Sequence, residues 1–574
     1  MHSVLREGDT NRRRLPCRHD GRRVACDSLR LLATVCDRNP ETRREDSMQG
    51  GAVTAWGLWE IMGWPAEGRR GTVSWGAVRG SGMAEYDGSR QARRKLDHSG
   101  VVMMSGDIPG SEGLQSRRRV AVFTGSFDPP TNYHREVVRR LREAGFAEVI
   151  VRPVVPRAET PDGEHAEPLH RAVMADLAFR DLPGVVVDLA ELEHGQHLPD
   201  HLLAEAYAQR GEVWQVVSAD FVRGGQQGAS LIQSRWQEGP VWWQQGRFVV
   251  LHARSAPPQR DDLPPHALVL NVEDHVPTAE IRRRVFEGKD IRPYVPEAVY
   301  AYIRRYRLFT GVPAPRETRV VLDDVRLRIL WDDGNPFAQK LAERFQRWQG
   351  EPPTAILVLG GDGTMLSAIR RHWRERLPFL GLNAGTLGFL MNEELPAELD
   401  HLELVLYRMP MLRVETTAPD GQRQQGLAYC DAWMERDSGQ AAWLRLEVDG
   451  RIQIPKLVGD GLLVATPAGS SGYARAMGAT PVPLSAPVLT LAGSNVFQPY
   501  FWKPVTLPET AHVRICNLDE RGKRPVRGFL DGHPLGPVST MDIRLSAVAA
   551  AELAFTPQYD LSERLLRSLF PAKE

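Results

Sequence analysis

One aspartate stands inside a run of glycines past the middle of the chain. Residues 355–364 read AILVLGGDGT, with Asp362 between two glycines. Glycines allow backbone N–H groups to approach a ligand closely, and the start of a helix favours an anion. An aspartate beside a phosphate site is useful when it holds a metal ion or takes a proton. These residues therefore predict phosphate chemistry in which Asp362 acts.

A second group of residues with chemical potential lies earlier in the chain. Residues 124–134 read TGSFDPPTNYH. Thr131 and His134 are three residues apart, so both side chains can point at one phosphate if a helix begins there. A histidine in that place can donate to the oxygens of a bound triphosphate. A lone histidine would more often cap the helix or pack against it, so its neighbours must decide.

The same order of strand, glycine turn and helix surrounds both groups. Residues 356–359 form a continuous apolar run, which is typical of a strand in a parallel sheet covered by helices. Residues 119–123 form the equivalent strand of the earlier group. Apolar side chains then recur at helical spacing after each turn, at Val137, Val138 and Leu141 and at Met365, Leu366 and Ile369. We therefore expect an α/β fold at both places.

Composition limits the class of protein. A chain of 574 residues should hold more than one domain, and its 42% hydrophobic and 25% charged residues are those of a globular protein. The net charge of zero does not indicate binding to nucleic acid or to a membrane surface. No apolar run reaches membrane-spanning length, and no signal peptide is recognised. The five cysteines show neither zinc-site nor disulfide spacing. We expect a cytoplasmic enzyme with no protein-held metal.

Residues 1–117 differ from the rest of the chain. Basic clusters, glycines, serines and isolated tryptophans are scattered through them without a strand or helix period. They are either a disordered basic arm or an extension upstream of a true start near Met103 or Met104. No function is assigned to them.

The central glycine run continues into a second motif. Residues 381–390 read GLNAGTLGFL. GGDGT followed by this segment resembles the NAD kinase family, whereas lipid kinases share only the GGDGT-like turn. The resemblance implies that Asp362 is the catalytic base or orients the attacking hydroxyl. It also implies nucleotide contacts from Gly361, Gly363, Thr364 and Asn383.

Two further segments extend this resemblance. Residues 460–473 read DGLLVATPAGSSGY and are similar to the family's DG…TPTGSTAY run, which implies ligand contacts from Asp460, Ser471 and Tyr473. The hydroxyl of Ser470 is also available. Cys430 and Asp431 stand where the family has an Asn-Asp or Asn-Glu pair that holds the ribose. The family fold implies an α/β domain over 319–400 and a β-rich domain over 401–574, whose end returns to the first. Residues 311–319 are expected to be a linker.

Residues 118–310 resemble the nicotinamide and nicotinate mononucleotide adenylyltransferases. The likeness rests on GSFDPPTNYHR, on the helix expected over 167–178, on Ser218-Ala219-Asp220 and on 276–283, VPTAEIRR. It implies a Rossmann-like doubly wound domain with His134 at the reacting phosphates. We expect Thr278 to cap a helix and Arg282 to lie in its first turns near an anion. The implied binding residues are Gly125, Ser126, Phe127, Thr131, Asp220, Thr278 and Arg282.

The two resemblances together predict a bifunctional enzyme. It would join ATP to NMN or NaMN and then phosphorylate NAD, with ATP as co-substrate and Mg²⁺ on the phosphates. Two alternatives stay open for the second part of the chain, a non-catalytic dinucleotide sensor and a lipid kinase. The family's assembly makes a homo-oligomer through the β-rich domain an expectation. The mononucleotide preference and the use of ATP or polyphosphate as donor are left open.

Overall fold

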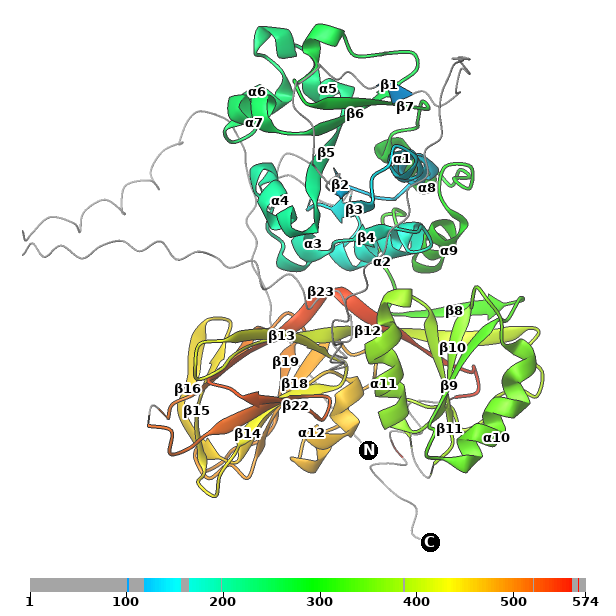
Figure 1. Ribbon diagram of the computed structural model, residues 1–574. Helices are drawn as coiled ribbons and strands as arrows, with labels where there is room; N and C mark the ends of the chain where they lie inside the picture. The colour runs from blue at the N-terminus through cyan, green and yellow to red at the C-terminus, as the bar shows by residue number, and fades with distance from the viewer. Residues whose placement is uncertain are drawn as a thin grey trace, which may run out of the picture. The chain divides into compact units, whose positions relative to one another are not determined.

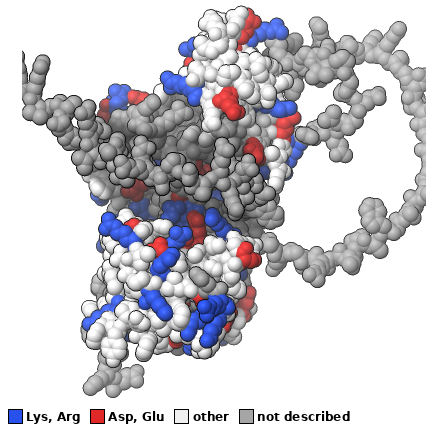
Figure 2. Space-filling model, turned by 90° about the vertical axis from the view of Figure 1, so that its left-hand side faces the viewer, with Lys and Arg blue, Asp and Glu red and all other residues white. Residues whose placement is uncertain are grey.

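The computed structural model describes residues 101–102, 118–155, 165–197, 199–385, 388–519, 521–559 and 566 (Figure 1). The expectations for residues 1–117 therefore lie almost wholly outside the described residues. All the described residues belong to one compact unit, Ala55–Glu574. Among them, no helix is both long and apolar enough to cross a membrane. On the face drawn in Figure 2, basic and acidic side chains both occur among the uncharged ones.

The first part of the described chain is built on a seven-stranded sheet of order β1-β7-β6-β5-β2-β3-β4. Strands β2 to β7 run parallel, and β1 pairs antiparallel with β7. The strands are β1 Val101–Val102, β2 Arg119–Gly125, β3 Glu148–Pro153, β4 Val185–Val187, β5 Glu212–Ser218, β6 Phe248–Ala253 and β7 Ala267–Val272. The helices are α1 Asn132–Glu143, α2 Pro168–Phe179, α3 Ala190–His194, α4 Asp200–Ala206, α5 Ala219–Val222, α6 Leu231–Arg235, α7 Gly239–Gln245, α8 Thr278–Phe286 and α9 Glu297–Tyr306.

Helices cover both faces of this sheet, as the apolar strands predict. Ala121 and Phe123 of β2 point into one core with α1, α2 and α9. Val120 and Val122 point to the opposite face, where Leu203 of α4 packs. Alternation along a strand sends successive side chains to opposite faces, so a strand with two covered faces must be apolar throughout. The prediction of a parallel sheet between helices is confirmed for this part.

The second part contains two sheets. A ten-stranded sheet has the path β16-β15-β20-β23-β11-β10-β9 with β12, β13 and β8 attached, and a six-stranded sheet has the order β19-β18-β17-β14-β21-β22. The strands are β8 Glu317–Leu322, β9 Leu327–Trp331, β10 Ala355–Gly360, β11 Pro378–Asn383, β12 Leu402–Thr417, β13 Arg423–Ala428, β14 Asp431–Arg436, β15 Ala442–Val448, β16 Arg451–Gly459, β17 Gly461–Ala465, β18 Val488–Ser494, β19 Val505–Pro508, β20 Val513–Asn517, β21 Val526–Leu530, β22 His533–Pro537 and β23 Thr540–Phe555. The helices are α10 Pro336–Phe345, α11 Asp362–His372 and α12 Tyr473–Ala476.

Two sixteen-residue strands join the α/β part to the β-rich part. Strand β23 pairs antiparallel with β12 along most of its length, and its last residues pair parallel with β11. Strand β12 also pairs with β8. The predicted linker over 311–319 is therefore too long, because Glu317 already begins a strand. The predicted domain boundary near residue 400 lies just before β12. The ten-stranded sheet contains strands from both sides of this boundary.

Helix α2 is buried on nearly all sides because it packs in two directions. One side belongs to the core of the seven-stranded sheet, and that core also contains Val548 and Ala550 of β23. Its Asp176 pairs with Arg374 at 2.6 Å and with Arg376 at 2.9 Å. These contacts connect α2 to the turn that follows α11.

Candidate nucleotide sites

Asp362 lies at the junction of β10 and α11, as its motif predicts. The helix begins at Asp362 itself, with Gly361 as its N-cap. One carboxylate oxygen accepts a hydrogen bond from the backbone N–H of Phe389 and the other from that of Leu390, both at 2.9 Å. The helix N-terminus stabilises the negative charge. Asp362 therefore also holds the LGFL segment in place.

The neighbouring strand brings Asn383 to the same edge. Asn383 ends β11, directly opposite Gly360 in the parallel register. Its Oδ1 accepts the N–H of Gly385 at 3.1 Å, and the N–H of Ala384 donates to the Gly360 carbonyl at 2.8 Å. The carboxyl ends of adjacent parallel strands meet at one edge, where α/β proteins bind ligands. Asp362 and Asn383 are thus brought together; Thr386 and Leu387 lie outside the described residues.

The glycines around Asp362 have different roles. A Cβ added to Gly360 would collide with the side chain of Thr364, so this glycine is needed for packing. A Cβ added to Gly361 or Gly363 would meet no atom of the described residues within 4 Å. The protein itself does not require glycine at these two positions. Open space beside a helix N-terminus leaves room for a phosphate.

The loop before β14 forms the other side of this site. The pKa of the half-buried Cys430 thiol is raised by burial and by the negative charges of Asp531, Asp431 and Asp362. Burial and the charge of Asp531 also raise the pKa of Asp431, to about 7. Cys430 packs against the hydrophobic cluster that lies beneath the GGDGT and LGFL segments. Met365, Leu390 and Tyr429 are among the members of this cluster.

Residues 466–473 form a third side of the candidate site, and the structure corrects one expectation for them. Ser471 ends a single 3₁₀ turn, and Tyr473 begins α12 with 40% of its surface exposed and its ring edge-on to Trp433. Ser470 is fully buried, and its hydroxyl donates to the Pro467 carbonyl and accepts the N–H of Val482. The expectation that Ser470 binds ligand is wrong, because its hydroxyl already holds the turn together.

Asp460 is bonded to other side chains of the β-rich part. It precedes β17, and Asp431 pairs with Ala465 at the opposite end of that strand. Its carboxylate is paired with Arg436 at 2.5 Å and accepts a hydrogen bond from Asn495 at 2.7 Å. Asp460 therefore anchors the start of the strand. Its contact with ligand stays a prediction.

In the first part of the chain, Thr131 and His134 bond to each other. Thr131 is the N-cap of α1, and its hydroxyl accepts the His134 N–H. The Thr131 N–H donates to Nδ1 of His134 at 3.0 Å, which completes a capping box. Burial, and then the neighbouring His275, lower the pKa of His134 to about 3. His134 is therefore neutral near pH 7, with its proton on Nε2, and among the described residues no partner of Nε2 is seen.

Arg282 reaches the loop after β2 from a position far along the chain. It donates to the Asp128 carbonyl at 2.8 Å and lies 3.9 Å from the carboxylate. Asp128 is fully buried and is also bonded to Nδ1 of His165 at 2.8 Å. Arg171 donates to the Ser126 carbonyl from α2. Asp128, His165 and Arg171 were not predicted; no spacing in the sequence distinguishes them from structural charges.

The helix that carries Arg282 differs from the expectation. Its N-cap is Pro277 and Thr278 is its first residue, so Thr278 is not a cap. Arg283 and Arg284 lie in the last turn of this nine-residue helix, where the dipole favours cations. Both pair with Glu280. They need no bound anion to explain them.

The remaining predicted residues of this part lie at the same sheet edge with unequal access. Gly125 ends β2, and Ser126 follows it. The Phe127 ring is fully buried against Phe123, Phe179 and His134, so only its backbone can meet a ligand. Asp220 is the second residue of the short helix after β5, is largely exposed and pairs with Arg223.

A protein-held metal site is not found among the described residues, since no group of three metal-ligating side chains occurs there. Both oxygens of Asp362 are occupied by backbone N–H groups. Magnesium usually keeps its waters and binds through substrate phosphates.

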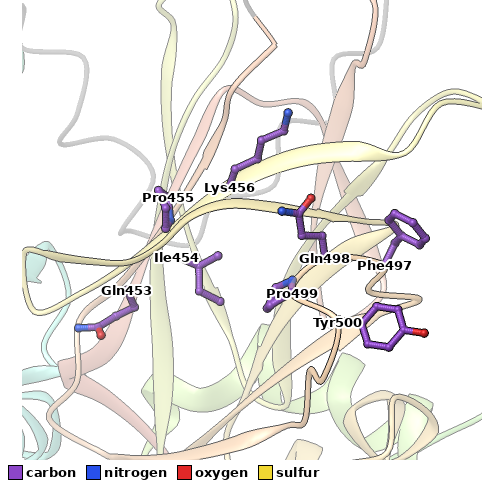
Figure 3. A pocket seen from close by; sticks show the side chains of 8 residues that line it. All are labelled: Gln453, Ile454, Pro455, Lys456, Phe497, Gln498, Pro499 and Tyr500. Carbon is purple, nitrogen blue, oxygen red and sulfur yellow. The ribbon is translucent and has the colours of Figure 1, made fainter.

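One hollow lies elsewhere, on the β-rich part (Figure 3). It has a volume of about 620 Å³ and contains none of the predicted site residues. Figure 3 shows the rings of Phe497 and Tyr500 beside it. These two rings and that of Phe501 are 73%, 81% and 88% exposed, next to the edge strand β16. Its lining residues are Gln453, Ile454, Pro455, Lys456, Phe497, Gln498, Pro499 and Tyr500.

Comparison with known proteins assigns the second part of the chain. Residues 333–408 match the model of the ATP-NAD kinase N-terminal domain. The NAD kinase of Brucella suis biovar 1 is 35% identical over 238 residues, which are 41% of this chain and 91% of that protein. That of Cereibacter sphaeroides strain ATCC 17025 is 35% identical over 243 residues and 94% of its length. A crystal structure of yeast NADH kinase complexed with NADH aligns with 44% of this chain and 89% of its own, at 16% identity and a TM-score of 0.37. The chain belongs to the NAD kinase family.

Proposed function

We propose that this protein transfers the γ-phosphoryl group of ATP to the adenosine ribose 2′-hydroxyl of NAD. The observation that carries the proposal is the position of Asp362, at the helix N-terminus at the same sheet edge as Asn383, over a hydrophobic cluster shared with Tyr429 and Cys430. Relatives that are 35% identical over nine-tenths of their length are named NAD kinase, which supports the same substrate. The lipid-kinase alternative gains no support from these relatives.

The reaction balances with groups that this site provides. The 2′-oxygen attacks the γ phosphorus, the bond from γ phosphorus to the bridging oxygen breaks, and ADP leaves. The hydroxyl proton passes to the carboxylate of Asp362, whose oxygens keep lone pairs beside the two backbone bonds. Magnesium that arrives on ATP supplies charge stabilisation, and positioning accounts for most of the remaining catalysis.

Residues 118–310 carry a second proposed activity, the joining of ATP to NMN or NaMN. A phosphate oxygen of the mononucleotide attacks the α phosphorus of ATP, and pyrophosphate leaves. Support comes from the parallel sheet, from the loop after β2 and from Arg282, which meets that loop from 154 residues away. Neutral His134 would act as a hydrogen-bond donor through Nε2–H, without bringing a full positive charge.

Two substitutions in the full chain separate the activities. Asp362→Asn is expected to reduce NADP formation by at least about a hundredfold, the range of one acid–base group, and to spare dinucleotide synthesis. His134→Gln is expected to do the reverse. Glutamine is a favoured third residue of a capping box, so it removes the imidazole but keeps the helix start. Mass spectrometry of both products, with thermal unfolding as a control for folding, measures the outcome.

The proposal requires that each substitution abolishes one reaction and spares the other. If Asp362→Asn abolishes both reactions in a folded protein, the two-site account is wrong. If His134→Gln leaves dinucleotide synthesis unchanged, the role of the histidine is refuted. A wild-type protein that binds NAD without making NADP would favour the dinucleotide sensor instead.

Self-association through the β-rich part is a further element of the proposal. The exposed rings of Phe497, Tyr500 and Phe501 beside an edge strand support it, since large exposed apolar patches commonly mark interfaces. Light scattering of the full chain measures its oligomeric state. A monomer at micromolar concentration would contradict self-association.

A further inference from the structure

The turn between β21 and β22 contains a carboxylate with an unusual number of backbone partners. The Asp531 side chain is only 4% exposed, and it accepts the N–H groups of three consecutive residues. The donors are Tyr429 at 2.8 Å, Cys430 at 2.7 Å and Asp431 at 3.1 Å. The N–H of Asp531 in turn donates to the Asp431 carbonyl at 2.9 Å. A carboxylate that accepts several backbone N–H groups is a strong, charge-assisted anchor.

The same loop is held from its other side by Thr466. The hydroxyl of this fully buried residue donates to the Tyr429 carbonyl at 2.7 Å, and its N–H donates to the Cys430 carbonyl at 2.8 Å. A Cβ on Gly469 would collide with the Cys430 backbone. Residues 429–431 therefore have their N–H groups fixed by Asp531, whereas the carbonyls of Tyr429 and Cys430 are fixed by Thr466.

Asp531 also connects this loop to the helix of the GGDGT motif. Arg370 of α11 lies 3.7 Å from the Asp531 carboxylate, and it donates to the Leu530 carbonyl at 3.4 Å. Helix α11 begins with Asp362. The β21–β22 turn thus touches both the loop predicted to bind the ribose and the helix that carries the predicted base.

We propose that Asp531 is a positioning residue for phosphorylation of NAD, fixing the Cys430–Asp431 loop against helix α11. This inference rests on the proposed function for its substrate. Its geometric part, the fixing of residues 429–431, is independent of that function. Asp531 is not assigned contact with substrate; it acts through the loop that it holds.

The electrostatics give the proposal a second signature. The charge of Asp531 contributes to the raised pKa of Asp431, after burial. Asp431 in turn acts on the Cys430 thiol and the Tyr473 phenol, whose pKa values are also raised, in both cases mainly by burial. Arg370 faces Asp531 from α11. Neutralising Asp531 should therefore lower the pKa of Asp431 and extend NAD binding by ionised Asp431 to lower pH.

Asp531→Asn in the full chain is the direct test. Asparagine tolerates the left-handed backbone of this position, φ 45°, but has one acceptor oxygen where three N–H groups need partners. We expect amide hydrogen exchange at residues 429–431 to quicken at least about tenfold and the Kd for NAD to rise by a similar factor, the effect of losing about one charged hydrogen bond. The pH profile of NAD binding should move to lower pH.

Asp449→Asn is the matched control. Asp449 is also left-handed, at φ 52°, precedes a glycine in a hairpin turn and accepts one backbone N–H, that of His512. It contacts none of the site residues named above, so exchange at 429–431 and NAD affinity should not change. If Asp531→Asn does not fold, Thr466→Val releases the loop from its other side. That variant should weaken NAD binding without the shift in pH profile.

The outcomes separate this inference from the proposed function. Unchanged exchange at 429–431, or unchanged NAD affinity despite faster exchange, in folded Asp531→Asn overturns the positioning role while NADP formation stands. A wild-type protein that makes no NADP overturns phosphoryl transfer, and the exchange and NAD-binding results still judge Asp531. If the wild-type protein neither makes NADP nor binds NAD, then NAD is not its substrate. In that case both the proposed function and the positioning role of Asp531 are wrong.

Discussion

Cys430 occupies the position where the NAD kinase pattern has an asparagine. Its backbone is fixed by Asp531 and Thr466, so its side chain is presented in a defined place. The pKa of its thiol is raised by burial and by three nearby carboxylates, which keeps the thiol neutral. A neutral thiol is a weak donor and a weak acceptor, so it replaces an amide poorly.

Cys430→Asn is expected to strengthen NAD binding. One regained hydrogen bond contributes about 1 kcal/mol, which corresponds to a roughly fivefold lower Kd. Titration calorimetry with NAD measures the change. Cys516→Ser, on β20, is the control and should leave the Kd unchanged. Equal or weaker binding by Cys430→Asn would show that the thiol has a role that an amide cannot fill.

At the residue scale, the sequence correctly places Asp362 at the start of a helix, but it does not reveal the bonding partners of Asp460 and Ser470. A local pattern of strand, glycine turn and helix places Asp362 without knowledge of the rest of the chain. Asp460 and Ser470 lie in a segment that resembles a binding motif, yet their partners Arg436 and Val482 come from elsewhere in the chain. Asp531 could be recognised only as a turn, because its three N–H partners are about 100 residues away.

The turn between β10 and α11 makes a prediction that separates ligand access from folding. Gly361 has ordinary extended dihedral angles, φ −117° and ψ −171°, and a Cβ there would meet open space. Gly361→Val should therefore keep the fold but fill the space for phosphate, raising the KM for ATP about tenfold or more, the effect of losing one or two hydrogen bonds. Steady-state kinetics and thermal unfolding measure the two effects.

Gly469→Ala provides the contrast. Its Cβ would collide with the Cys430 backbone, so this smaller change should lower stability by about 1–3 kcal/mol, the usual cost of overpacking. If Gly361→Val destabilises the protein as much as Gly469→Ala, the glycine at 361 serves the fold and the ligand explanation fails.

At the element scale, hydrophobic periodicity in the sequence predicts short strands and helices. It does not predict which long strands pair with each other. Strands β12 and β23 each run for sixteen residues. Their partners lie far away in the chain, and local pattern carries no information on such pairing. Helix α2 was predicted as a helix, but its burial on both sides depends on β23 and the turn after α11.

At the scale of the whole molecule, buried polar groups connect the first part of the chain to the kinase part. His170 of α2 bonds to the Tyr302 hydroxyl at 2.9 Å and contacts Arg408 of β12. Burial, and then the charge of Arg408, lower the pKa of His170 to about 3. In the unfolded chain a histidine titrates near pH 6.5. The unfolded state therefore binds more protons below that pH, and folding stability is lost as the pH falls from about 6.5 toward 3.

His170→Gln is expected to reduce this acid sensitivity. Each pH unit across the window removes up to about 1.4 kcal/mol through a single group of this kind. The lowered pKa of His134 also makes the fold less stable as the pH falls, whereas the raised pKa of Asp431 makes it more stable. The informative quantity is therefore the difference in acid sensitivity between wild type and variant. Melting temperatures near pH 7 and near pH 5 measure it, with exposed His401→Gln as control. An equal loss on acidification in wild type and His170→Gln would contradict the argument.

The central claim is that the kinase part is a working enzyme despite Cys430. The full chain, incubated with NAD, ATP and magnesium and analysed by mass spectrometry, tests it directly. The account predicts NADP in the wild type and its loss in folded Asp362→Asn. A wild-type protein that binds NAD and still forms no NADP would contradict the account.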